Sequence, residues 1–115
     1  MEPKEFDFEF PRGDTCPYLF EITDTNGNTL NLSNTTDITM TARDTSKNII
    51  FQKKLSRSEI TVDGKDALIV IEHKDTKDLK IGGKYEYDIE FTDSYSDYHL
   101  TIIIGTFKLT KEVTY

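Results

Sequence analysis

The sequence predicts an all-β protein, built as a sandwich of about seven to nine short antiparallel strands. Three observations support this prediction. Apolar and polar residues alternate in several short segments, as they do in strands that bury one face. Turn-forming residues separate these segments at intervals of roughly eight to twelve positions. The composition includes seven Phe, six Tyr and no Trp, with many Ile and Thr, which favour strands.

The clearest strand lies in the stretch 80–91, KIGGKYEYDIEF. After a glycine pair, its apolar side chains fall on one face of the strand, and these are Tyr85, Tyr87, Ile89 and Phe91. Charged residues occupy the alternate positions. We therefore expect a central strand with one face in a core and the other in water.

The strands before it are bounded by prolines, glycine turns and polar loops. We expect a first strand over residues 5–10, closed by Pro11, and a second over residues 18–24, closed by the tight-turn pair Asn26-Gly27. Residues 29–32 are expected to begin a short extended segment that runs back after this turn. Further strands are expected over residues 37–43 and 49–55, and a hairpin pairs residues 59–62 with 67–72 across a glycine-containing loop.

The rest of the chain follows the same pattern. Residues 73–79 are polar and form the one candidate for a helical turn, which Asp75 is expected to cap. After the central strand we expect a loop over residues 93–97 and a long strand over residues 100–109, with a bulge or bend at Gly105. The tail is short and β-prone. At 115 residues, the chain is expected to form a single domain over residues 1–115.

Charge and cysteine content exclude several classes of function. The formal net charge is −7, which disfavours binding to nucleic acid and to anionic membranes. Cys16 is the single cysteine, so neither an intrachain disulfide nor a cysteine metal site is expected. The polar, acidic start lacks the apolar stretch of a signal peptide, and synthesis in a cytoplasm is expected.

Few motifs suggest chemistry. Arg12-Gly13-Asp14 spells the integrin-binding tripeptide, but turn chemistry explains it better, with Gly13 allowing a kink and Asp14 bonding to nearby backbone. His73 and His99 are not at ligand spacing. Acidic turns, such as the one over residues 24–28, lack the spacing of a calcium loop. We expect no catalytic residues, no metal and no cofactor, and hence no enzyme.

The stretch before the central strand has a specific structural interpretation. Leu79, Gly83 and Tyr85 stand in a Leu-x-x-x-Gly-x-Tyr spacing. This spacing resembles the tyrosine corner of immunoglobulin-like domains, in which the Tyr hydroxyl bonds to backbone a few residues upstream. Tyr87 stands where an antibody domain places its second cysteine. The prediction is therefore an immunoglobulin-like β-sandwich without the disulfide.

Three segments together carry a family resemblance. They are residues 11–15 (PRGDT), residues 83–89 (GKYEYDI) and residues 105–109 (GTFKL) leading to Glu-Val-Thr at 112–114. In this order they resemble the immunoglobulin-like N-terminal domain of tailed-phage baseplate upper proteins, and the small stand-alone phage and prophage proteins built from it. The resemblance covers nearly the whole chain. It implies an anchoring role and no active site, because the motif positions are turn and core positions.

The resemblance leads us to expect a virion structural protein, in the tail, baseplate or neck, that acts as an adaptor through contacts with other virion proteins. We expect it in the phage particle, repeated as a homo-oligomer or as copies in a symmetric assembly. The exposed ends, the first strand and the tail after Leu109, are β-prone and suited to pairing with another chain. A capsid decoration or head-fibre component is an alternative, because the fold occurs in both settings.

A further alternative is a host-surface carbohydrate-binding module. Tyr95 and Tyr98, with Asp97 between them, offer aromatic rings next to a polar group. The competing interpretation is that these loop tyrosines pack on the end of the sandwich.

Overall fold

The computed structural model describes residues 3–24 and 26–111. Its strands and helices follow one another in this order: β1 (Lys4–Glu5), β2 (Phe8–Pro11), β3 (Cys16–Glu21), β4 (Thr36–Arg43), β5 (Ile49–Lys54), the 3-10 turn η1 (Leu55–Arg57), β6 (Ile60–Asp63), β7 (Asp66–Ile71), α1 (His73–Thr76), β8 (Lys84–Asp93) and β9 (Tyr98–Thr110). Among these residues, no helix is long and apolar enough to cross a membrane.

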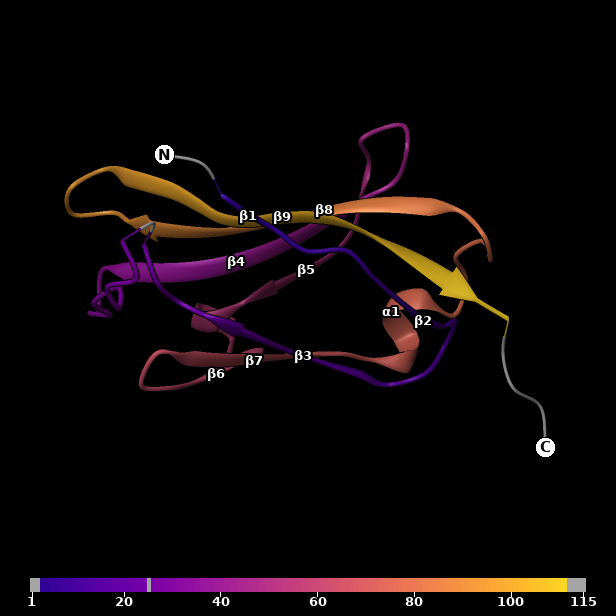
Figure 1. Cartoon of the computed structure of the whole chain (residues 1–115), viewed down its shortest axis with the longest axis horizontal. Coiled ribbons are helices and arrows are strands. Elements are labelled where there is room, and N and C mark those ends of the chain that lie inside the picture. The colour runs from indigo at the N-terminus through magenta and orange to yellow at the C-terminus, as the bar shows by residue number, and fades with distance from the viewer. Residues whose placement is uncertain (1–2, 25, 112–115) are drawn as a thin grey trace.

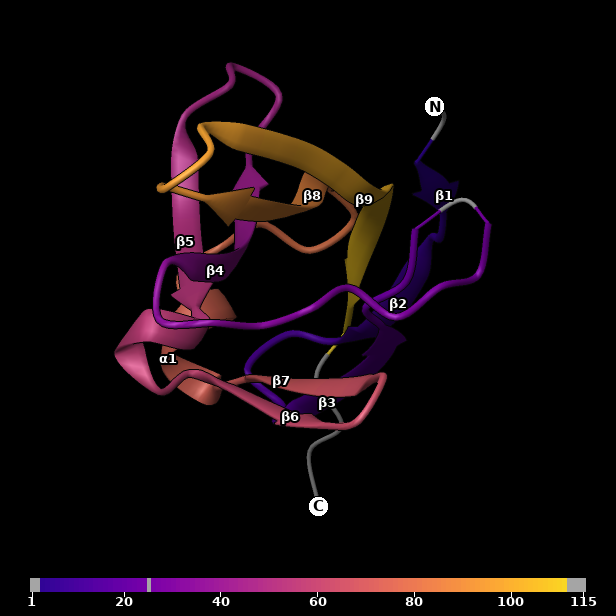
Figure 2. The ribbon, with the colours of Figure 1, turned by 90° about the vertical axis from the view of Figure 1, so that its left-hand side faces the viewer.

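The strands form two sheets that face each other (Figure 1). The first sheet has the order β1-β9-β8-β4-β5, with β2 also paired to β9. The second has the order β3-β7-β6. Figure 2 shows the second sheet below the first, and Figure 1 shows α1 at the right-hand end of the sandwich, between the two layers. The predicted all-β sandwich is confirmed, and its strand order is that of an immunoglobulin-like fold.

The inward faces of both sheets meet in a continuous core. The central strand β8 alternates as expected, and Tyr85, Tyr87, Ile89 and Phe91 are all buried. Phe107 of β9 is fully buried. Its ring packs against four aromatic rings from neighbouring strands, those of Phe8, Phe10, Phe51 and Tyr85. Burial of this alternating apolar face is the main stabilising term for the fold.

The N-terminal segment differs from the expected single strand over residues 5–10. It forms two short strands, β1 and β2, that pair in parallel with β9, so that Lys4 lies beside Ile103 and Pro11 beside Thr110. The other strand pairs are antiparallel. The first strand therefore already has a partner along one edge within its own chain. The expected pairing end after Leu109 continues as β9 to Thr110, and residues 112–115 lie outside the described residues.

Two smaller expectations are corrected. The irregularity in β9 lies between Thr101 and Ile103, opposite the Ile89/Glu90 step of β8, whereas Gly105 pairs regularly with Tyr87. Glu72, not Asp75, occupies the N-cap of α1. The Asp75 carboxylate instead accepts a 2.7 Å bond from the Glu72 N–H, which is the backward half of a capping box.

Candidate interaction surface

The predicted tyrosine corner is present at the start of β8. The Tyr85 hydroxyl accepts a 2.9 Å bond from the Lys80 N–H and donates a 3.0 Å bond to the Lys80 carbonyl. Gly83 leaves room for this ring, because an added Cβ there would lie 3.2 Å from the Tyr85 oxygen. Leu79 is half-buried and packs against the core. The corner therefore fixes the connection between the second sheet and β8.

Tyr87 belongs to a hydroxyl chain that joins both sheets to the N-terminal segment. Its oxygen lies 2.8 Å from the hydroxyl of Tyr18 on β3, and it donates a 2.6 Å bond to the Phe6 carbonyl. Because the Tyr87 proton is used on Phe6, Tyr18 is the donor to Tyr87. Tyr18 and Tyr87 thus stand where immunoglobulin domains place the disulfide between their sheets. The sequence indicated the missing disulfide but not Tyr18 as the partner.

The tyrosine pair predicts loss of stability at alkaline pH. Burial is the largest cause that raises the pKa of both Tyr18 and Tyr87 above the ordinary value of 10.0. The folded state therefore holds protons that the unfolded state releases near that pH, so stability is complete below it and falls as pH rises above it. We expect the free energy of unfolding, measured by urea titration, to decline from about pH 10 upward.

The matched variants isolate this pair. The double variant Tyr18→Phe/Tyr87→Phe is expected to flatten the decline, whatever its stability at neutral pH. Tyr95→Phe, which changes a tyrosine that is 88% exposed, is expected to leave the decline unchanged. An equal slope in all three proteins would contradict the assignment.

The segment Arg12-Gly13-Asp14 is held against α1 rather than presented as a loop tip. Gly13 has φ +80°, donates its N–H to the Thr76 hydroxyl at 2.8 Å, and accepts a 2.8 Å bond from His73 Nδ1. The guanidinium of Arg12 donates to the Leu79 carbonyl at 3.2 Å. Arg12 and Gly13 are half-buried and Asp14 is exposed. Gly13 provides the expected kink, and the turn is closed by a 3.2 Å backbone bond from the Asp14 N–H to the Pro11 carbonyl.

The three residues proposed as a carbohydrate platform lie in the loop after β8 and at the first position of β9. Tyr95 is 88% exposed, whereas the Tyr98 ring packs edge-on against Phe91 with centroids 6.3 Å apart. Asp97 accepts from His99 Nε2 at 3.2 Å. A hydrogen bond to Glu90, followed by the one to Asp97, raises the pKa of His99. Tyr98 therefore packs on Phe91 with one edge of its ring while 43% of it stays exposed, and Tyr95 is the more exposed of the two tyrosines.

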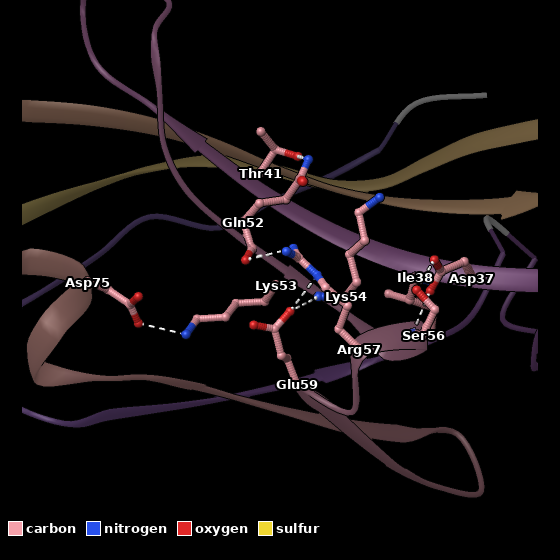
Figure 3. A network of polar contacts seen from close by, with 10 residues as sticks. All are labelled: Asp37, Ile38, Thr41, Gln52, Lys53, Lys54, Ser56, Arg57, Glu59 and Asp75. Carbon is pink, nitrogen blue, oxygen red and sulfur yellow. Dashed lines mark hydrogen bonds and ion pairs between the residues drawn. The ribbon is translucent and has the colours of Figure 1, made fainter.

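A buried ion pair links β5 to α1 (Figure 3). The Lys53 ammonium lies 2.7 Å from the Asp75 carboxylate, and the two side chains are only 5% and 9% exposed. Near it, Arg57 contacts Glu59 at 2.9 Å and the Gln52 carbonyl at 3.1 Å. Because each buried charge needs the other, this pair fastens the helical turn to the first sheet.

An open groove of about 600 Å³ runs between the N-terminal segment, β3 and the first half of β9. Its walls carry apolar side chains from all three, and two are well exposed: Phe6 at 50% and Leu19 at 70%. Carboxylates line its margin, from Glu5, Glu21 and Asp24, with Lys4 as the cation among its lining residues. No local pattern in the sequence indicates this groove, because it forms only where the fold brings β1 of the first sheet beside β3 of the second.

Other chemical groups are sparse in the described part of the chain. Within residues 3–24 and 26–111, no group of three or more His, Cys, Asp or Glu side chains is placed to hold a metal ion. Cys16 is a free, half-buried thiol, and burial raises its pKa. No protein-family model matches the chain, and no curated protein matches it. The candidate functional features are therefore the groove and the exposed Tyr95 loop.

Proposed function

We propose that this protein is a non-enzymatic bacteriophage virion structural protein, an adaptor of the tail, baseplate or neck that acts through protein–protein contacts. The groove beside β3 supports the contact role, because exposed apolar side chains next to an outer strand edge are typical of surfaces that bind other chains. The resemblance of residues 11–15, 83–89 and 105–109 to baseplate upper proteins is the basis for the virion setting. The tyrosine corner at Tyr85 fits the immunoglobulin-like domain of that resemblance.

In this role the sandwich acts as a rigid spacer that presents its edges to neighbouring subunits. The sheets share a continuous core and are tied by the Tyr18–Tyr87 hydrogen bond, so the relative positions of the exposed edges are fixed. Repeated copies in a symmetric particle allow weak individual contacts to add up to stable attachment.

Antibody-gold labelling of intact phage particles from the source strain tests the proposal. Label at the tail tip, baseplate or neck supports the adaptor role. Label over the head replaces it with the capsid decoration alternative. If intact and disrupted particles stay unlabelled while infected cells contain the protein, the virion proposal is wrong.

A further inference from the structure

The outer edge of β3 is available for pairing with another strand. Among the described residues, β3 is paired with β7 and lies at the end of its sheet. The Ile22 N–H donates to the Lys65 carbonyl at 2.8 Å, which places the backbone groups of every second residue toward β7. By this alternation Tyr18 and Phe20 face β7. Pro17, Leu19 and Glu21 therefore turn their backbone groups outward.

Pro17 agrees with this assignment. A proline has no N–H to donate, so within a sheet it is tolerated where the backbone faces away from the neighbouring strand. Leu19 and Glu21 then supply two outward N–H groups, and all three residues supply outward carbonyls. This is the pattern of donors and acceptors that an added strand recognises.

The groove beside this edge provides room and apolar contact. An added strand next to β3 points alternate side chains inward, toward the groove walls formed by Phe6, Phe20 and Ile102. Its other side chains lie beside the exposed residues of β3, of which Leu19 is 70% exposed. The surface therefore selects a segment with apolar residues at every second position.

The charges at the edge specify the rest of the occupant. Glu21 lies directly opposite Asp66 in the sheet, and like charges in that position are destabilising. The Lys65 ammonium approaches Glu21 only to 4.0 Å, and Asp24 and Glu5 add negative charge at the groove margin. A Lys or Arg on the added strand beside Glu21 relieves this repulsion.

We propose that the β3 edge and its groove bind an extended segment of a partner protein, in which apolar residues alternate with polar ones and a basic residue lies beside Glu21. A second copy of this chain is a poorer occupant, because each copy carries a net charge of −7 and the same acidic margin. This inference rests on the proposed function only in taking the partner to be another virion protein. Its test uses the purified protein and a peptide, so a negative binding result can be distinguished from a negative result in the virion labelling.

The probe is a capped synthetic peptide of about seven residues, in which isoleucine alternates with lysine and threonine. A peptide with glutamate in place of lysine is its control. We expect saturable binding of the basic peptide in a titration followed by amide NMR, with the shifts concentrated on β3, β1 and the first half of β9. Absence of saturable binding overturns the proposal, as does equal binding of the acidic peptide.

Variants at the two outer edges of the second sheet, β3 and β6, provide a test and its control. Leu19→Pro removes an outward N–H while sparing the bonds to β7, and it is expected to weaken binding by about tenfold or more. Val62→Pro makes the same change at an outward position of β6, the opposite edge, and is expected to leave binding unchanged. Equal weakening by both variants overturns the proposal.

Glu21→Lys keeps the test sound if Leu19→Pro fails to fold, because it changes only an exposed side chain. We expect this variant to bind the acidic peptide more tightly than the basic one, the reverse of the wild-type preference. Unchanged preference overturns the charge assignment. A dimer of the wild-type protein in analytical ultracentrifugation that Glu21→Lys or Leu19→Pro dissociates would show a second copy as the occupant, and would also overturn the proposal.

Discussion

Asp75→Asn and Lys53→Met are each expected to lower the free energy of unfolding by about 3–5 kcal/mol, because either change leaves one charge buried without its partner. The two side chains are 5% and 9% exposed and 2.7 Å apart, so water has little access to solvate the charge that remains. The Asn amide oxygen still offers an acceptor for the Glu72 N–H. The loss in Asp75→Asn is therefore attributed to the ion pair. Urea denaturation followed by circular dichroism measures both variants.

A control for this prediction lies on the same helical turn. Lys74 pairs with Glu72 at 3.4 Å, but both side chains are more than half exposed. Lys74→Met is expected to change stability by less than about 0.5 kcal/mol. The double variant Lys53→Met/Asp75→Leu, which removes both charges, is expected to recover part of the single-variant loss. Equal losses in Lys74→Met and Lys53→Met would contradict the buried-pair account.

Gly105→Ala is expected to destabilise the protein by about 2–3 kcal/mol, at the upper end of the usual cost of overpacking. A Cβ at this position would lie 1.8 Å from the Phe6 carbonyl oxygen and 2.9 Å from Cε1 of Tyr87. The oxygen is a backbone atom that cannot rotate away, so the N-terminal segment must leave β9. Its departure breaks the bond from the Phe6 N–H to the Ile104 carbonyl and the bond from Tyr87 to Phe6.

Hydrogen exchange at the Phe6 amide separates this steric effect from a general one. In Gly105→Ala we expect that amide to lose protection while the amides of β3 and β7 keep theirs. Gly82→Ala serves as the comparison, because its Cβ meets open space and its only cost is a φ of +77°, about 1–2 kcal/mol. Full protection of Phe6 in Gly105→Ala would refute the close approach.

Local patterns in the sequence predicted most of the sheet structure. The strict alternation from Tyr85 to Phe91 fixes which face of β8 is buried, and the spacing of Leu79, Gly83 and Tyr85 indicates the corner that precedes it. Both signals lie within a few residues of the structure they describe. The parallel pairing of β2 with β9 is different, because it joins Phe8 to Phe107, and no local pattern encodes a contact of that separation.

The buried ion pair was missed because Lys residues are almost always exposed. A signal was nevertheless present: Lys53 stands two residues after Phe51, so strict alternation places both side chains on the inward face of β5. The groove depends on the placement of β1 and β3 in opposite sheets, which the sequence does not state. Of the residues proposed as a carbohydrate platform, the sequence could not distinguish Tyr95 from Tyr98, because only the fold brings Phe91 against the second ring.

The parallel pairing of the N-terminal strands has a mechanical consequence. Lys4 pairs with Ile103 and Pro11 with Thr110. If the chain is pulled at its N-terminal side before β1 and at its C-terminal side after β9, the two forces act along these parallel strands in opposite directions. Such a load shears the backbone bonds of β1 and β2 together instead of opening them one after another. The hydrogen bond from the Tyr87 hydroxyl to the Phe6 carbonyl also holds this N-terminal segment in place under such a load. The sandwich is therefore built to resist stretching between its two ends before its core is disturbed.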